Sequence, residues 1–113
     1  MIKIYSEILI NAKELKEKIE SGHDFILIDV LSKNSFEARH IKNSINIPLE
    51  ELGEMAPEQL PNKNKEIIVY CASKTCPASP TAARKLEEMG YKNVIDFEDG
   101  LTGWQEAGYE FKE

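Results

Sequence analysis

Hydrophobic residues in this sequence gather into short runs that polar segments separate. Runs rich in β-branched residues are typical of buried strands, and they occur at residues 8–10, 25–30, 44–47, 67–71 and 93–97. Between these runs, the sequence predicts helices at residues 12–21, 50–59, 79–89 and 101–107, and a helical turn at residues 35–38. Because strands alternate with helices, we expect an α/β fold with a parallel sheet that helices cover on both faces.

Capping residues refine the ends of two of these helices. Asn11 is followed three residues later by Glu14, the pattern of a capping box, so we expect a helix to begin there and end before Gly22. Before the helix at residues 79–89, Ser79 is suited to the N-cap and Pro80 to the first helical position. We therefore place the start of that helix at Ser79.

Length and composition are those of one globular domain, which we expect to span residues 1–113. The net charge of −6 disfavours a nucleic acid or an anionic membrane as a partner. The first residues lack the apolar core of a signal peptide, and no run is long enough to span a membrane. Two cysteines five positions apart form no disulfide framework, which favours a reducing, cytoplasmic setting.

The chemistry centres on Cys71, which ends the run at residues 67–71 and precedes a loop and a helix. Ligands bind at the carboxyl edge of open α/β sheets, and a helix N-terminus directs N–H groups toward anions. We expect these amides, with Lys74, to lower the pKa of the Cys71 thiol and make its thiolate a nucleophile. The candidate substrate-binding residues are Ala72, Ser73, Lys74, Thr75 and Cys76. The alternative is that Cys71 is an ordinary buried thiol at the end of a strand.

Two further polar residues are candidates for supporting roles. Asp29 ends the run at residues 25–30, where a carboxylate either approaches the active site or fixes a neighbouring loop. His40 is suited to general acid–base chemistry, or to a structural role through hydrogen bonds. We expect no metal and no cofactor, because two thiols and one distant histidine leave a zinc site incomplete.

Six segments together resemble the rhodanese-like domain family over nearly the whole chain. They are residues 27–30, 36–48, 68–71, 82–83, 90–94 and 99–104. The resemblance implies a sheet flanked by helices, with Cys71 at the family's catalytic position. It also implies a sulfurtransferase, in which Cys71 takes sulfane sulfur as a persulfide from thiosulfate or a small persulfide. The acceptor would be cyanide, a thiol or a sulfur-accepting protein.

The sequence departs from the family pattern at several positions. Leu31 and Arg39 stand where members commonly have arginine and glycine, and Cys76 lies near the usual place of a loop arginine. Cys76 is either a thiol that resolves a persulfide on Cys71 or a spare thiol that only packs. An inactive, partner-binding module is the alternative function. A phosphatase or arsenate reductase is disfavoured, because no loop arginine offers bidentate contacts to an oxyanion.

Overall fold

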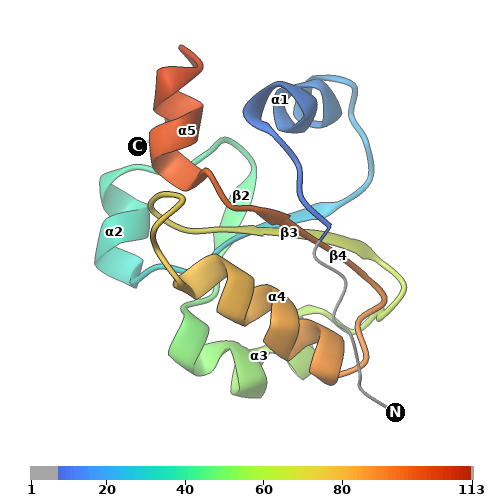
Figure 1. Cartoon of the computed structure of the whole chain (residues 1–113). Helices are drawn as coiled ribbons and strands as arrows, with labels where there is room; N and C mark the ends of the chain where they lie inside the picture. Colours follow the sequence, from blue (N-terminus) through green and yellow to red (C-terminus); the bar gives the residue numbers. More distant parts are fainter. Residues whose placement is uncertain (1–7, 113) are drawn as a thin grey trace.

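The computed structural model describes residues 8–112, and its centre is a sheet of four parallel strands in the order β2–β1–β3–β4 (Figure 1). The strands are β1 (Ile26–Asp29), β2 (Ser44–Asn46), β3 (Glu66–Tyr70) and β4 (Asn93–Phe97). Tyr70 pairs with Asp29 on one side and with Phe97 on the other, so three strands end at the same level. The predicted parallel sheet is confirmed, and the strand before Cys71 is one of its two inner strands.

Helices cover both faces of this sheet, as the alternation of strands and helices predicts. They are α1 (Ala12–Glu20), α2 (Lys33–Ala38), α3 (Leu52–Gln59), α4 (Ala78–Glu88) and α5 (Gly100–Glu106), with a short 3-10 helix, η1 (Leu49–Glu51), before α3. Figure 1 shows α3 and α4 on one face and α1 and α5 on the other. Successive side chains of β3 pack on opposite faces of the sheet: Val69 packs toward α3 and α4, and Tyr70 packs toward α1 and α5.

Local capping signals locate the start of α1 correctly. The side chain of Asn11 accepts a hydrogen bond from the Glu14 N–H, and the Glu14 carboxylate accepts one from the Asn11 N–H. The helical turn at residues 35–38 is the end of α2, which Ser32 caps. Residues 8–10 are less regular than expected, because only Leu9 forms a β-bridge, to Asp96 of β4.

The predicted N-cap of α4 is wrong by two residues, and the difference matters for the site. Pro77 is the N-cap and the helix begins at Ala78, so Ser79 lies inside the first turn and is fully buried. Pro80 is tolerated at the third position because the first N–H groups of a helix have no intrahelical partner. Ser79 is therefore free to direct its N–H and its side chain toward Cys71 instead of capping the helix.

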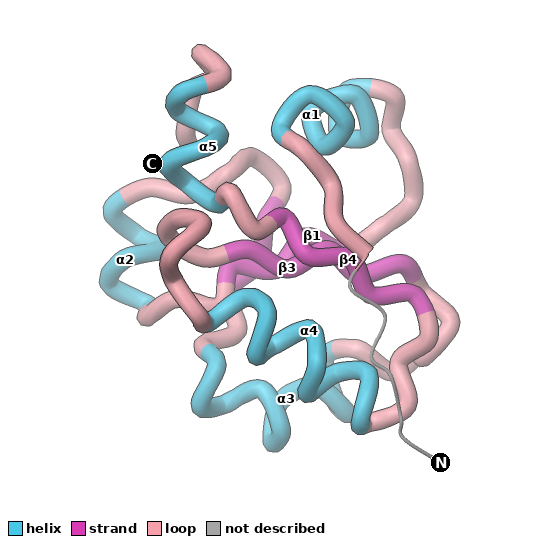
Figure 2. The backbone as a smooth tube through the Cα atoms, in the orientation of Figure 1, coloured by secondary structure: helices cyan, strands magenta, loops and turns pink. Residues whose placement is uncertain are grey.

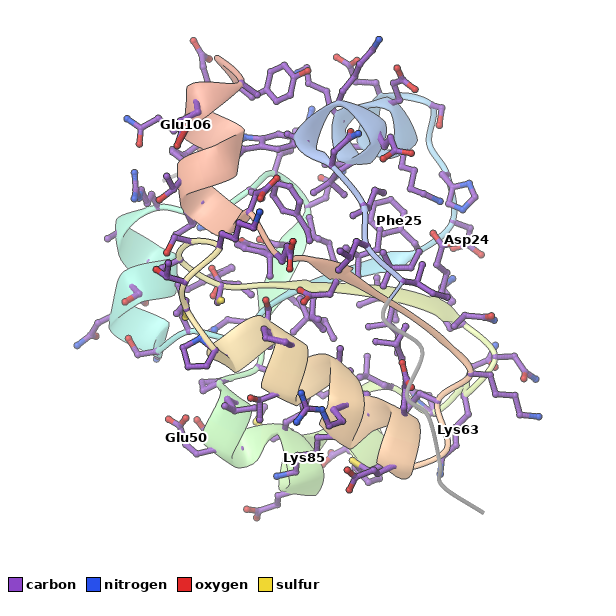
Figure 3. All side chains as sticks on the ribbon, viewed as in Figure 1. Asp24, Phe25, Glu50, Lys63, Lys85 and Glu106 are labelled. Atoms are coloured by element: carbon purple, nitrogen blue, oxygen red, sulfur yellow. The ribbon has the colours of Figure 1, made fainter. Side chains whose placement is uncertain are left out.

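Most charged side chains lie on the outside of this layered structure, whereas Asp29 and Asp96 are buried. Figure 3 shows Glu50, Lys85 and Glu106 extending away from the sheet, and all three residues are exposed. Trp104 of α5 is almost fully buried against the sheet and belongs to the core. None of the helices formed by residues 8–112 is both long enough and apolar enough to span a membrane.

Candidate active site

Cys71 directly follows β3 and begins the loop that leads to α4. Figure 2 shows this loop beside the first turn of α5. Two hydrogen bonds join them: the Leu101 N–H donates to the Cys71 carbonyl at 3.0 Å, and the Thr102 N–H donates to the Ala72 carbonyl at 2.9 Å. The start of α5 thus fixes the backbone on which the candidate nucleophile is carried.

Gly100 allows α5 to approach this backbone so closely. Its φ is +61°, and a Cβ atom built there would lie 2.3 Å from the Cys71 carbonyl oxygen, well inside contact distance. Only glycine satisfies both conditions without strain. The helix expected at residues 101–107 begins one residue after Gly100, so sequence reasoning missed this contact, although the Asp99–Gly100 pair was the available signal.

The sulfur of Cys71 contacts two carbonyl oxygens and one amide. It lies 3.4 Å from the Cys76 carbonyl oxygen and 3.9 Å from that of Ser73, and it accepts a hydrogen bond from the Ser79 N–H at 3.4 Å. The carbonyl contacts suit a thiol that donates its proton, and they do not suit a thiolate. The predicted cradle of several amides around Cys71 is therefore wrong, because the Ser79 N–H is joined at the sulfur by two carbonyl oxygens.

Ser79 supplies a second potential donor to the same sulfur. Its hydroxyl lies beside Cys71 and lowers the pKa of that thiol. Within residues 8–112, the hydroxyl oxygen has no nitrogen or oxygen as a hydrogen-bond partner. A buried hydroxyl without another partner is unusual, because leaving it unpaired costs about 1–3 kcal/mol. Sequence reasoning missed this role because it placed Ser79 at the N-cap.

The two thiols of the loop differ in acidity, in the direction opposite to expectation. Burial raises the pKa of Cys71, and the contact with the Cys76 side chain also raises it, while both donors on Ser79 act against this rise. Burial also acts to raise the pKa of Cys76, but a hydrogen bond from Cys71 and the backbone amides of Ala78 and Ala72 lower it overall. Cys76 is therefore the thiol that ionises first, and the predicted low pKa of Cys71 is wrong.

This difference predicts two separate pH profiles for alkylation by iodoacetamide. Because the thiolate is the reacting species, the alkylation rate of Cys76 should rise at lower pH than that of a free thiol. The rate of Cys71 should rise at higher pH, and Cys76→Ala should shift that rise to lower pH by removing the contact between the thiols. Trypsin cleaves after Lys74, so mass spectrometry of peptides 66–74 and 75–84 measures each cysteine separately. The opposite order of the two profiles would contradict the assignment.

The other predicted site residues lie at different distances from this chemistry. Ala72 and Ser73 are half-buried in the loop, whereas Lys74 and Thr75 are exposed. Asp29 is fully buried, and its carboxylate accepts a hydrogen bond from the Leu31 N–H at 2.8 Å and contacts the Tyr70 hydroxyl. Tyr70, which Asp29 contacts, packs toward α1 and α5, whereas Cys71 packs toward α3 and α4 on the opposite face of the sheet. Asp29 therefore fixes the loop after β1 and does not reach the Cys71 sulfur.

The structure also places His40 in a structural environment. Its ring stacks on that of Phe36 with centroids 3.9 Å apart, and its Nδ1 is 2.8 Å from the Phe36 carbonyl oxygen. Its backbone pairs with that of Lys112. These contacts hold the end of α2 against the C-terminal segment. As for metals, residues 8–112 contain no group of three or more His, Cys, Asp or Glu side chains arranged to hold an ion.

Comparison with known proteins gives a consistent classification. The rhodanese-like domain model matches residues 11–107. The chain is 33% identical over 95 residues to the putative sulfur carrier protein YrkF of Bacillus subtilis, covering 84% of this chain and 49% of that protein. It is 29% identical over 82 residues to the thiosulfate sulfurtransferase GlpE of Coxiella burnetii, covering 73% of each chain. The crystal structure of the BH2092 protein from Bacillus halodurans superimposes with a TM-score of 0.86 at 26% identity, covering 94% of this chain and 77% of that one.

Cys71 follows an inner parallel strand and lies beside the N-terminus of α4, and the family model covers this whole segment. The chain belongs to the rhodanese-like family. Its relatives include proteins named as sulfur carriers and sulfurtransferases, at about 30% identity. The chain spans about half the length, or less, of the first curated relatives it matches.

Proposed function

We propose that this domain is a sulfurtransferase that carries sulfane sulfur as a persulfide on Cys71. One observation carries the proposal: Cys71 follows an inner strand and meets both the N–H and the unpartnered hydroxyl of Ser79 at the start of α4. Two donors from one buried residue are suited to a sulfur that becomes negatively charged. The names of the relatives, a sulfur carrier and a thiosulfate sulfurtransferase, support the same chemistry.

The reaction balances without a cofactor. The Cys71 thiolate attacks the outer sulfur of thiosulfate. The bond between the two sulfur atoms of thiosulfate breaks, and sulfite leaves with the electron pair of that bond. Cys71 then carries the transferred sulfur as a persulfide. A thiophilic acceptor such as cyanide or a thiol attacks the outer sulfur, and the Cys71 thiolate leaves. A small persulfide is an equivalent donor, with a thiolate in place of sulfite as the leaving group.

Burial of Cys71 sets a condition on this cycle. Cys71 is fully buried and faces two carbonyl oxygens, so a donor reaches it only after the loop shifts. Because burial raises the pKa of Cys71, the rate of transfer should increase with pH through and above the neutral range. A buried, protonated Cys71 is also what an inactive module would have. A partner-binding module without sulfur transfer is therefore the second candidate function.

The test combines thiocyanate formation with location of the sulfur. At least one of the wild type and Cys76→Ala, given thiosulfate and excess cyanide, should form thiocyanate catalytically, and Cys71→Ser should form none. In Cys76→Ala, loading with thiosulfate alone should add one sulfur atom to peptide 66–74, which contains Cys71. Absence of thiocyanate from both the wild type and Cys76→Ala, a Cys71→Ser variant that keeps full activity, or a sulfur located on peptide 75–84 in the wild type would overturn the proposal.

Partners and location follow from this chemistry as further parts of the proposal. The donor class is thiosulfate or a small persulfide, and the acceptor class is a thiol, cyanide or a sulfur-accepting protein. Cys71 and Cys76 are both free thiols, which is consistent with a reducing, cytoplasmic setting.

A further inference from the structure

The first turn of α4 donates backbone N–H groups to two sulfur atoms. The Ser79 N–H donates to Cys71, and the Ala78 N–H donates to Cys76. We propose that Cys76 resolves a persulfide on Cys71, so that the site releases the sulfur as hydrogen sulfide and ends as a Cys71–Cys76 disulfide. This inference rests on the proposed function, because it begins from the Cys71 persulfide.

The folding of the loop brings the two cysteines together. The Cys76 N–H donates to the Ser73 carbonyl at 3.0 Å, which closes a turn and directs residue 76 back over residue 71. The Cys71 sulfur lies 3.4 Å from the Cys76 carbonyl oxygen, and the two side chains contact each other. Both side chains pack in the cluster formed by β3, α3 and α4. This proximity is compatible with the Cα separation of about 4.4–6.8 Å that a disulfide needs.

The charge distribution favours Cys76 as the attacking group. Backbone amides of Ala78 and Ala72 donate to its sulfur, and Cys76 is only half-buried, whereas the Cys71 sulfur faces carbonyl oxygens. The nucleophile in thiol–disulfide exchange is a thiolate, and Cys76 is the thiol of this pair that ionises first. The resolving thiolate is thus already in place beside the sulfur that it attacks.

The step balances within the loop. The Cys76 thiolate attacks the Cys71 sulfur, a bond forms between these two sulfur atoms, and the bond to the outer sulfur breaks. The outer sulfur takes up a proton from solvent and leaves with the electron pair as hydrosulfide. The sulfane sulfur is reduced and the two cysteines are oxidised to a disulfide. An external dithiol must then reduce this disulfide, and the half-buried Cys76 gives it a point of attack.

Attack by Cys76 on the persulfide should be faster than attack by a thiol in solution. A reactive group held on the same short loop has an effective concentration of at least the order of millimolar, and far more when well oriented. Sulfide release by the wild type should therefore follow loading without any added thiol. This property separates a resolving cysteine from a spare one, because a spare thiol would leave the persulfide to external acceptors.

The experiment uses the pre-reduced full chain, thiosulfate as the donor, and no reductant or cyanide. We expect the wild type to release close to one sulfide per chain and then to stop. Its trypsin digest should contain peptides 66–74 and 75–84 joined by a disulfide. Added dithiothreitol should restart sulfide release. Cys76→Ser and Cys76→Ala should each release less than a tenth as much sulfide and retain the extra sulfur on Cys71.

The outcomes distinguish this inference from the proposed function. Equal sulfide release and equal persulfide lifetime in the wild type and both Cys76 variants would overturn the resolving role. If those variants also form thiocyanate normally with cyanide, the sulfurtransferase proposal stands without it. Failure of every Cys76 variant and of the wild type to acquire sulfur or form thiocyanate would overturn both. A disulfide that forms equally fast without thiosulfate would also count against the resolving role, since air oxidation would explain it.

Discussion

Replacing Gly100 with alanine is expected to remove most sulfur transfer and to destabilise the domain. The new Cβ would meet the Cys71 carbonyl oxygen at 2.3 Å, and alanine would have to adopt a φ of +61°. The left-handed backbone costs about 1–2 kcal/mol, and forcing atoms into a packed region costs roughly 1–3 kcal/mol more. Thermal or denaturant unfolding measures the loss of free energy of unfolding.

The effect on activity has a separate physical origin. To relieve the clash, α5 must move away from residues 71 and 72, which breaks the hydrogen bonds from Leu101 and Thr102. A displacement of about 1 Å at a reacting atom can lower a rate about 100-fold, so we expect a loss of that order in thiocyanate formation. The measurement is made well below the unfolding temperature of the variant, so that unfolded protein does not account for the loss.

Gly108 provides a matched control at the other end of the same helix. Its φ is +86°, but among residues 8–112, its two chain neighbours aside, no atom lies within 4 Å of a Cβ built there. Gly108→Ala should therefore cost only the backbone strain of about 1–2 kcal/mol, and its sulfur transfer should equal that of the wild type. If the two alanine variants lose the same activity, the approach of α5 to Cys71 does not position the nucleophile.

The features that sequence alone predicts correctly are those that neighbouring residues decide. Asn11 and Glu14 satisfy each other across three positions, so the capping box is visible in the sequence and present in the structure. The strand before Cys71 is an uninterrupted apolar run because both faces of an inner parallel strand are buried. The family resemblance rests on such segments, and the comparisons confirm it.

The features that it fails to predict depend on contacts between distant segments. Both Pro77 and Ser79 are acceptable at a helix start, and burial of Ser79 against Cys71 decides between them. Peptide orientation in the loop is another example, because the sequence does not show whether Ser73 and Cys76 present carbonyls or amides to a sulfur. The pKa of Cys71 depends on that orientation and on burial, so its predicted direction was wrong.

Ser79→Ala is expected to lower the rate of sulfur transfer about 100-fold while leaving the domain as stable as the wild type. The hydroxyl of Ser79 lies beside the Cys71 sulfur and has no nitrogen or oxygen partner within residues 8–112. Loss of one donor to a developing anion typically lowers a rate about 10²–10³-fold. Removing a buried hydroxyl that has no other partner also removes its desolvation cost, so stability should be equal or slightly higher.

Three measurements separate this role from simple packing. The Ser79 side chain lowers the pKa of Cys71, so its removal should move the alkylation profile of Cys71 to higher pH. Thr81→Ala is the control, because its hydroxyl donates to the Pro77 carbonyl at 2.7 Å in the same turn and is exposed. That variant should keep the rate and the pH profile of the wild type. Unfolding experiments complete the set: a Ser79→Ala variant that loses stability but keeps its rate of transfer would make Ser79 a packing residue.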